Sequence, residues 1–266
     1  MSDYFYKKEI QGYVVNAFTS EAFKGNPAGV IFVEKFPTDD VMKHIVRETR
    51  LPEISFIQVD GETYHIRWFA EKKEIELCGH GTIAAAHVLF VHHKVSTPFI
   101  RFQSQKYDIQ VSRQGSSYQM TMPLRRLVPA NNYQELEQAL NTPIKTLWRG
   151  HSYLAWINNE MELLQLQPNK EKISALDLSG VIVAAPSDDF DYVCRYFAPQ
   201  VGIDEDAVTG SAHAAIATHL FEATQQTDFR AAQYSARGGV LSLKIHQQHV
   251  LLSGEAYTAF DFRMFL

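Results

Sequence analysis

Two short segments of the chain place glycine and a hydroxyl residue directly before an alanine-rich, apolar stretch. Gly79–Thr82 (Gly-His-Gly-Thr) precedes the first stretch, and Gly210-Ser211 precedes the second. A stretch that is apolar on nearly all faces predicts a buried helix. The first N–H groups of a helix lack internal partners and carry partial positive charge, so both starts suit a carboxylate or a developing enolate. Ordinary helix capping by Thr82 and Ser211 is the alternative, and capping does not exclude ligand binding.

The residues that lead into these two helices are also repeated. Arg67–Ala70 (Arg-Trp-Phe-Ala) is matched by Arg195–Ala198 (Arg-Tyr-Phe-Ala), and Gly81 is matched by Gly210. The two matches have offsets of 128 and 129 residues, close to half of the 266-residue chain. Because matches at nearly one offset indicate a duplicated unit, we expect two similar halves with a ligand cleft between them. Two unrelated α+β domains that share a packing solution are the alternative.

Strand and helix signals fill both halves in a similar order. We expect helices at residues 38–50, 79–90, 131–140 and 210–221. We expect strands at residues 11–19, 29–33, 54–59, 63–69, 98–103, 107–113, 117–122, 151–158, 161–166, 181–185, 191–197, 231–236, 240–246 and 249–254. Residues 24–29 are rich in turn formers and predict a loop. The halves are expected to span 1–120 and 121–255, with the apolar end 256–266 as a candidate to join the first half.

The composition excludes several classes of function. Of the 266 residues, 45% are hydrophobic and 21% are charged, which is ordinary for a globular protein. The net charge is −5 and Lys and Arg form no cluster, so we expect neither a nucleic-acid partner nor a membrane surface. No apolar run reaches the roughly 18 residues of a transmembrane helix, and the N-terminal residues lack a signal-peptide pattern. Two cysteines form no disulfide scaffold, which favours a reducing cytoplasm.

Motifs for metal and nucleotide chemistry are absent from the sequence. It contains no HExxH or clustered Cys/His spacing, no GxGxxG, no Walker loop and no GxSxG. We therefore expect no metal ion, no bound nucleotide and no serine nucleophile.

Four further segments follow one another along the chain: Asn16–Phe18 with Gly25–Ala28, Leu51–Phe56, Glu76–Thr82, and Asp204–His213, which contains an Asp-x-x-Thr-Gly-Ser signature. Together they resemble motifs of the PhzF (phenazine biosynthesis-like) family. The resemblance implies an α+β fold like that of diaminopimelate epimerase, with two pseudo-symmetric domains that each curl a mixed sheet around a central helix. It also implies a homodimer, an active site between the domains, no cofactor, and an isomerase that moves a hydrogen on a small molecule.

The resemblance implies catalytic roles for three residues. Glu53 falls on the glutamate that acts as acid and base, and partial burial before an apolar strand is expected to raise its pKa. Asp206 is expected to orient the substrate or assist proton transfer, although an acid near a helix start also stabilises the helix dipole. His80 is expected to be a neutral donor or to orient the substrate, because a helix N-terminus disfavours the imidazolium. A packed, hydrogen-bonded histidine is the alternative. The expected substrate-binding residues are Gly79, Gly81, Thr82, Gly210, Ser211, Asn26 and Cys78.

Cys78 admits a second interpretation. Cys78–Gly81 (Cys-Gly-His-Gly) also resembles the Cys-Gly-Asn-Gly segment of diaminopimelate epimerase, in which one thiol of a pair acts. The second helix start has Val208–Gly210 and no cysteine, so racemisation by two thiols is not expected. A small wall residue and a reactive thiol both stay open for Cys78.

The predicted function is a cofactor-independent isomerase that moves a proton on a small, carboxylate-bearing molecule by acid/base catalysis. An amino-acid racemase or epimerase and a non-catalytic small-molecule-binding protein of the same fold are the alternatives. Pro52, Gly81 and Ala207 stand where the family often has other residues. We therefore expect a pocket of different shape from that of the phenazine enzyme and predict no particular substrate.

Overall fold

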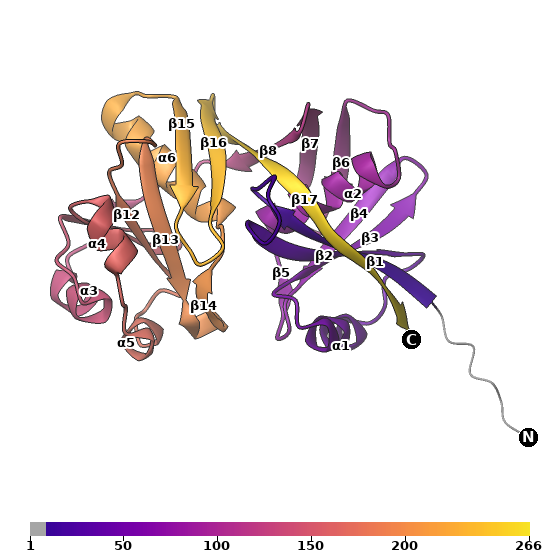
Figure 1. Cartoon of the computed structure of the whole chain (residues 1–266), viewed down its shortest axis with the longest axis horizontal. Coiled ribbons are helices and arrows are strands. Elements are labelled where there is room, and N and C mark those ends of the chain that lie inside the picture. Colours follow the sequence, from indigo (N-terminus) through magenta and orange to yellow (C-terminus); the bar gives the residue numbers. More distant parts are fainter. Residues whose placement is uncertain (1–8) are drawn as a thin grey trace, which may run out of the picture. The chain divides into compact units, whose positions relative to one another are not determined.

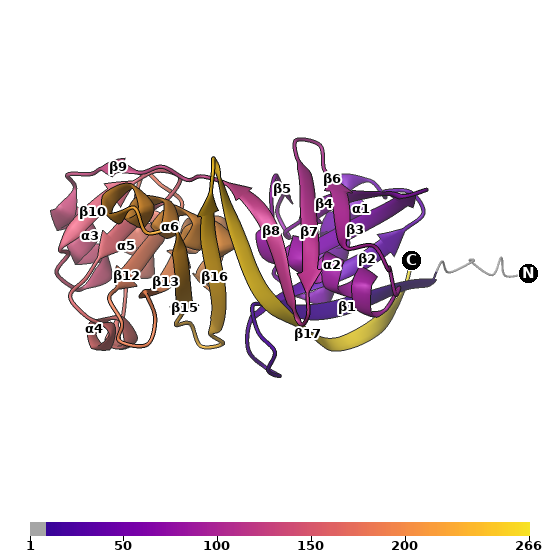
Figure 2. The same cartoon turned by 90° about the horizontal axis from the view of Figure 1, so that it is seen from above.

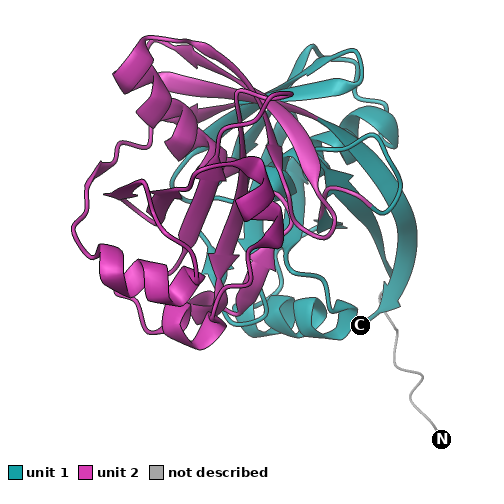
Figure 3. Ribbon diagram, turned by 60° about the vertical axis from the view of Figure 1, so that its left-hand side comes forward, with its two compact units in different colours: residues 1–23, 27–120, 255–266 teal, residues 24–26, 121–254 magenta. Residues whose placement is uncertain are grey.

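The computed structural model describes residues 9–266, which form two compact units. Unit 1 contains the described residues up to Phe23, Pro27–Met120 and Glu255–Leu266, and unit 2 contains Lys24–Asn26 and Thr121–Gly254 (Figure 3). None of the described helices combines the length and apolar character that crossing a bilayer requires. The expectation about a signal peptide falls largely on residues 1–8, which lie outside the described residues.

Unit 1 is a mixed β-sheet curled around one helix (Figure 1). Its strands are β1 (Glu9–Ala17), β2 (Asn26–Val33), β3 (Ile54–Asp60), β4 (Thr63–Phe69), β5 (Glu74–Ile75), β6 (Phe99–Gln103), β7 (Asp108–Gln114), β8 (Ser117–Pro123) and the C-terminal part of β17 (His249–Phe265). The pairs β2–β3 and β4–β6 are parallel, whereas β3–β4, β6–β7 and β7–β8 are antiparallel. Helix α2 (Gly79–Val91) packs against β1, β3 and β7 and buries every residue from His80 to Phe90. Helix α1 (Asp39–Thr49) is amphipathic and buries Met42, Ile45 and Val46.

Unit 2 repeats this plan around helix α6 (Gly210–Thr224), which packs against β16 (Figure 2). Its strands are β9 (Val128–Pro129), β10 (Thr146–Arg149), β11 (Tyr153–Trp156), β12 (Val181–Ala185), β13 (Tyr192–Ala198), β14 (Ile203–Asp206), β15 (Asp228–Gln233), β16 (Gly239–His246) and the first part of β17. The pairs β11–β12 and β13–β15 are parallel, and β12–β13 and β15–β16 are antiparallel, in the same order as in unit 1. Shorter helices complete it: α3 (Tyr133–Leu140), α4 (Glu160–Gln165), α5 (Lys170–Ser174) and the 3-10 turn Pro199–Val201.

The repeated Arg-x-Phe-Ala sequence has the same structural role in both units. The guanidinium of Arg67 forms two hydrogen bonds to Glu74, at 2.8 and 2.6 Å, and lies over the ring of Phe69. The guanidinium of Arg195 binds Glu205 in the same way, at 2.7 and 3.0 Å, and lies over Phe197. A bidentate pair of this kind fixes the short strand that leads to each helix.

The predicted α+β fold, with two similar halves that each curl a mixed sheet around a helix, is confirmed.

One expectation about local structure was wrong, and five short elements were missed. Residues 161–166, expected as a strand, lie mostly in α4, because the Asn159 side chain accepts a hydrogen bond from the Glu162 amide and caps a helix. That helix buries Leu163 and leaves Met161 and Leu164 exposed, so the apolar residues of this segment were mistaken for those of a strand. The short elements α5, β5, β9, β10 and β14 were not predicted at all, because they are too brief to carry a periodic pattern.

The turn at residues 24–26 belongs to unit 2 although it lies between two strands of unit 1. The Gly25 amide donates to the carbonyl of Gly238, and the Arg237 guanidinium donates to the carbonyls of Lys24 and Gly25. These bonds hold the turn in place. The predicted loop at residues 24–29 is shorter than expected, because β2 already begins at Asn26. At the other end of the chain, β17 pairs antiparallel with β1 as far as Phe265, so residues 256–265 are a strand of unit 1.

Candidate functional site

The start of α2 in unit 1 is tightly packed. Cys78 is the N-cap residue, and its Sγ accepts a hydrogen bond from the Gly81 amide at 3.3 Å. The Thr82 hydroxyl donates to the carbonyl of Cys78 at 2.6 Å and is therefore committed to its own helix. A Cβ at position 81 would lie 2.8 Å from Oγ of Ser55 and 2.9 Å from Sγ of Cys78. Only glycine fits at position 81, because neighbouring groups already fill that space.

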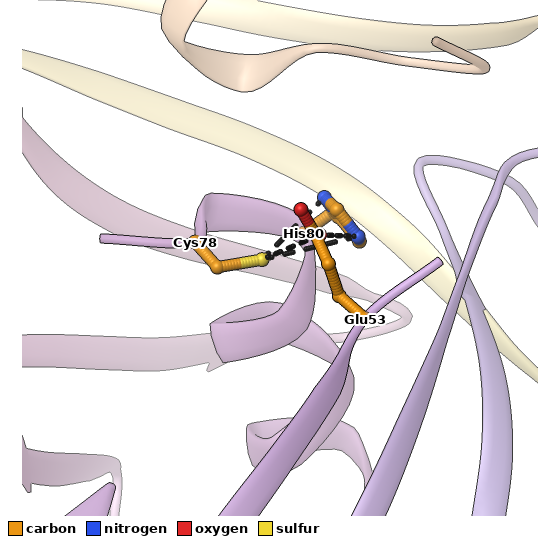
Figure 4. A group of neighbouring side chains, drawn as sticks. All are labelled: Glu53, Cys78 and His80. Atoms are coloured by element: carbon orange, nitrogen blue, oxygen red, sulfur yellow. Dashed lines mark hydrogen bonds and ion pairs between the residues drawn. The ribbon is translucent and has the colours of Figure 1, made fainter. Parts of the chain in front are cut away.

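Glu53 is held at the edge of this helix start by the backbone. It directly precedes β3, and its carbonyl accepts a hydrogen bond from the Gly29 amide at 2.9 Å. The residue is 8% exposed, and its Oε2 lies 2.8 Å from Nε2 of His80 and 3.1 Å from Sγ of Cys78 (Figure 4). Oε1 receives no hydrogen bond from the described residues. It is not fully buried. One carboxylate oxygen is therefore occupied by two donors, and the other is open.

Mutual charge stabilisation sets the protonation states of Glu53 and His80. Burial acts to raise the pKa of Glu53, but the charge of His80 and hydrogen bonds from His80 and Cys78 outweigh it, so the pKa is lowered. Burial acts to lower the pKa of His80, but its interactions with Cys78 and Glu53 raise it well above the ordinary value of 6.5. At neutral pH the pair is thus a carboxylate and an imidazolium. The sequence-based expectations of a raised Glu53 pKa and a neutral His80 were both wrong, because each overlooked the other partner.

Cys78 carries a thiol rather than a thiolate at neutral pH. Burial and the neighbouring Glu53 charge raise its pKa to about 11. Its S–H can therefore donate to Glu53 while its sulfur accepts from Gly81. The ligand atoms of Glu53, Cys78 and His80 lie within 4.8 Å of one another, and such donors suit zinc. Here Oε2 of Glu53 contacts both Nε2 of His80 and Sγ of Cys78 directly, which is a hydrogen-bonded arrangement.

The start of α6 in unit 2 is built from neutral groups around one carboxylate. The Thr209 hydroxyl does not cap the helix but donates to Oδ2 of Asp206 at 2.5 Å. Nδ2 of Asn26 donates to Oδ1 of Asp206 and to the carbonyl of Val208, both at 2.8 Å. Gln233 accepts from the Thr209 amide and donates to the Asp206 carbonyl, which ties the segment to β15. The Asp206 carboxylate is thus held in a fixed orientation by two side chains.

The first two amides of α6 are available. Neither the Gly210 N–H nor the Ser211 N–H donates to any of the residues 9–266, and the Ser211 side chain is exposed. The amides of Gly79 and His80, the first two residues of α2, likewise donate to none of these residues. Each unit therefore presents a helix start with two free N–H groups, as the sequence predicts.

The structure gathers the predicted site residues in two sets, one in each unit. Unit 1 brings together Glu53, Cys78, Gly79, His80, Gly81 and Thr82, and unit 2 brings together Asn26, Asp206, Gly210 and Ser211. Sequence reasoning missed Thr209, although its hydroxyl lies inside the Asp-x-x-Thr-Gly-Ser signature. It also missed Ser55 and Gln233, for which no signal exists, because their partners lie 24–27 residues away.

The chain is similar to proteins of one family along nearly its whole length. The family model described as phenazine biosynthesis-like protein (PhzC-PhzF) matches residues 15–261. An uncharacterized isomerase of Halalkalibacterium halodurans is 36% identical over 253 residues, which cover 92% of this chain and 95% of that protein. An uncharacterized isomerase of Pseudomonas aeruginosa is 34% identical over 248 residues, which cover 93% of this chain and 96% of that protein.

Solved structures share the fold. The crystal structure of a PhzF-family protein of Enterococcus faecalis has a TM-score of 0.91 at 35% identity and covers 97% of this chain and 100% of that chain. A hydroxyproline epimerase of Agrobacterium vitis, solved with trans-4-hydroxy-L-proline bound, has a TM-score of 0.63 at 12% identity. It covers 98% of this chain and 94% of that chain, and at this identity the likeness concerns the fold alone.

Proposed function

We propose that this chain, which belongs to the phenazine biosynthesis-like (PhzC-PhzF) family and is an isomerase, moves one proton between two carbons of a small, carboxylate-bearing molecule. The family assignment confirms the resemblance seen in the sequence. The observation that carries the mechanism is the buried Glu53 carboxylate, with Oε2 bound by His80 and Cys78 and Oε1 open. We propose that the reaction needs neither a metal ion nor an organic cofactor.

Glu53 acts first as base and then as acid. Its Oε1 takes a proton from a C–H bond next to an electron-withdrawing group, and the electron pair of that bond stays on the substrate. The same oxygen then returns the proton to a second carbon of the same molecule, where a new C–H bond forms. The carboxylate regains its starting charge, so the cycle consumes no oxidant, reductant or external acid.

The charge that develops on the substrate is stabilised by groups of unit 1 that are already in place. The free amides of Gly79 and His80 begin α2, whose dipole favours negative charge at this end. The His80 imidazolium adds a full positive charge beside Glu53. Such preorganised groups act strongly in a site that excludes water, because they need no rearrangement during the reaction.

Asp206 in unit 2 has a binding role in this proposal. Asn26 and Thr209 hold its two oxygens, so it presents a fixed negative charge to a substrate ammonium or hydroxyl group. The free amides of Gly210 and Ser211 suit a substrate carboxylate. The expectation that both helix starts act on one ligand stays a prediction, as do the homodimer and the cytoplasmic location.

A thiol base is not supported. The pKa of Cys78 is raised to about 11, and Cys194, which lies on β13, has its pKa raised further by burial. Cys194 is fully buried in unit 2, where its Sγ contacts the ring of His213. A racemase that uses two thiolates on opposite faces of one carbon needs a pair that this chain does not supply.

Exchange with deuterated solvent tests the proposal. The enzyme is incubated in D₂O with a panel of small cyclic and acyclic amino and hydroxy acids, and NMR follows deuterium incorporation and isomer formation. We expect Glu53→Gln to lower exchange by roughly 10²- to 10⁴-fold, because general acid–base catalysis is worth that much. Cys78→Ser and the exposed control Glu76→Gln are expected to keep most of the rate.

Three outcomes would contradict the mechanism. Full exchange by Glu53→Gln together with loss in Cys78→Ser would assign the base to the thiol. Deuterium at one inverted carbon, without a shifted hydrogen, would make the enzyme an epimerase. Saturable binding of a panel member without any exchange would make the protein a non-catalytic binder.

A further inference from the structure

Unit 1 contains a pocket of about 290 Å³ between β5 and the turn that joins β6 to β7. Its wall includes the apolar residues Ile66, Trp68 and Ile75, and its rim includes Glu76, Ser104 and Lys106. Neither Glu53 nor His80 is among the described residues that line it. The pocket is therefore distinct from the proton-transfer group.

The internal repeat identifies the counterpart of this pocket in unit 2. The matching Arg–Glu pairs align β4 with β13 and β5 with β14. Ile75 follows the glutamate of one pair and Asp206 follows that of the other, so these two residues correspond. Three residues further on, Cys78 and Thr209 are the N-cap residues of α2 and α6. The two segments that lead into the helices are thus equivalent residue by residue.

The residue of unit 2 that corresponds to Ser104 on the rim is Gln233. The parallel ladders that join these strands to β4 and β13 end with the pairs His65–Gln103 and Cys194–Gln233. Cys194 lies one residue before the arginine of its strand, and His65 lies two residues before its own. The counterpart of Gln233 is therefore one residue beyond Gln103, at Ser104.

The two counterparts differ in what their side chains bind. The Gln233 carboxamide is buried; it accepts from the Thr209 amide at 2.8 Å and donates to the carbonyl of Asp206 at 2.8 Å. The Ser104 hydroxyl donates to the carbonyl of Tyr107 at 3.0 Å and accepts from the Tyr107 amide at 2.9 Å, inside its own turn. A carboxamide thus fills this place in unit 2, and a pocket lies there in unit 1.

Two N–H groups of the surrounding residues have no partner among residues 9–266. Trp68, which belongs to the pocket wall, is 1% exposed, and its Nε1 is buried without a hydrogen bond. The backbone amide of Cys78, the counterpart of the Thr209 amide that binds Gln233, donates to none of these residues either. Buried indole N–H groups normally have an acceptor, and an unsatisfied one costs free energy. A ligand oxygen would remove that cost.

The charges around the pocket favour a neutral ligand. Of the described residues that line it, Lys106 alone is a cation, and it forms an ion pair with Glu76. Glu74 binds the guanidinium of Arg67. The pocket therefore has no free positive charge to offer an anion, and a buried anion without one is costly. A carboxamide carries an acceptor oxygen and two N–H donors without net charge.

We propose that this pocket binds a small neutral molecule with a primary carboxamide, held as the side chain of Gln233 is held in unit 2. Its oxygen accepts from Nε1 of Trp68 and from the Cys78 amide, and its NH₂ group donates to the carbonyl of Ile75. A bound carboxamide then ties down the segment that leads into α2, as Gln233 does for α6. The site goes beyond the proposed proton transfer and contains no group of that mechanism.

NMR titration of the ¹⁵N-labelled full chain tests this site with propionamide, which is the glutamine side chain as a free molecule. We expect saturable shifts of the Trp68 indole and Cys78 amide signals with a Kd of about 1–10 mM, because so few atoms bind weakly. Propionate has the same shape with a charge and is expected to bind at least about tenfold more weakly. The indole signals of Trp148 and Trp156, both in unit 2, are expected to stay unchanged.

Variants of the rim and the wall make the test specific. Ser104→Gln supplies a carboxamide from the chain itself and is expected to weaken propionamide binding about tenfold or more, whereas the exposed control Ser96→Gln should bind like the wild type. If Ser104→Gln unfolds, Trp68→Phe serves instead. Followed through the Cys78 amide, it should bind about fivefold more weakly, because one hydrogen bond is lost.

The result does not depend on the proposed reaction, because Glu53→Gln is expected to bind propionamide like the wild type. Equal binding of propionate and propionamide would overturn the proposal. So would unchanged propionamide binding in a folded Ser104→Gln or Trp68→Phe variant, or the absence of saturable shifts in the wild type.

Discussion

The two helices α2 and α6 begin at equivalent points of similar units, yet different side chains surround their starts. At α2, two free amides lie beside Glu53, Cys78 and His80, which can all titrate. At α6, two free amides lie beside Asp206, which accepts hydrogen bonds from the neutral side chains of Asn26 and Thr209. The fold therefore supplies the same backbone donors and helix dipole twice, and the neighbouring side chains decide between proton transfer and binding.

The buried histidines of the two helices show the same contrast. His80 lies 2.8 Å from the Glu53 carboxylate, and its pKa is raised well above the ordinary value. His213 contacts the Tyr192 hydroxyl and the Cys194 sulfur, and burial without a carboxylate partner lowers its pKa to about 3. Burial alone thus leaves a histidine neutral, and a carboxylate within hydrogen-bond distance reverses that outcome.

Among the residues around Glu53 and Asp206, the largest expected effect comes from removing the charge of His80. His80→Gln removes a positive charge that stabilises the charge developing on the substrate, so we expect it to lower the exchange rate about 100-fold. The Glu53 pKa should also rise in this variant, because burial would no longer be outweighed. The wild-type rate should fall on the acid side only below the ordinary glutamate value of 4.5, and His80→Gln should move this limb to higher pH. The measurement is the pH profile of exchange. His213→Gln is the control, and an equal shift in that variant would break the comparison.

The next effect separates binding from chemistry. Asp206→Asn should raise KM about tenfold or more and change kcat much less, because a binding contact to a charged group is lost and Glu53 is untouched. The exposed Asp204, which pairs with Lys170, provides the control variant Asp204→Asn. Steady-state kinetics of both variants decide the point. A loss that falls mainly on kcat would give Asp206 a part in proton transfer instead.

A smaller effect concerns the thiol of unit 1. Cys78→Ala removes the donor to Oε2 of Glu53 and should lower kcat about tenfold. The fall of the rate on the acid side should then begin at a higher pH than in the wild type. Cys78→Ser keeps a donor and should stay within about threefold of the wild type. Cys194→Ser, in the other unit, should leave kcat unchanged. Equal loss in the alanine and serine variants would show that sulfur itself, rather than a donor, is needed.

The smallest effect on activity, and a measurable one on stability, comes from His213. Its folded pKa of about 3 lies below the unfolded value of 6.5, so the unfolded chain binds more protons between these values and stability falls on acidification. We expect the free energy of unfolding to drop by about 2 kcal/mol from pH 7 to pH 5 on account of this residue. Denaturant unfolding at both pH values measures it. His213→Gln should reduce this drop, whereas the exposed His246→Gln should not.

The sequence predicted what depends on local pattern and missed what depends on contact across the sheet. The two helix starts were located because Gly-Thr and Gly-Ser each precede a long apolar helix. The hydrogen bond between Glu53 and Cys78 spans 25 residues, and no spacing rule predicts that separation. Both pKa directions were therefore predicted wrongly, since the sequence reports burial but not the partner.

The same reasoning explains the missed features of unit 2. Gln233 binds the Asp206 segment from β15, and nothing in its own neighbourhood distinguishes it from other strand residues. Repetition of Arg-x-Phe-Ala, by contrast, was visible, because the ion pair and the ring contact act within ten residues of each arginine.

The protonation state of His80 tests the central claim most directly, and it requires no substrate. In protein labelled with ¹⁵N-histidine, NMR at pH 7 reports whether one or both ring nitrogens carry a proton, and His80→Gln assigns the signal. We predict two protonated nitrogens for His80 at pH 7. A neutral His80 ring under the same conditions would contradict the carboxylate–imidazolium pair on which the mechanism rests.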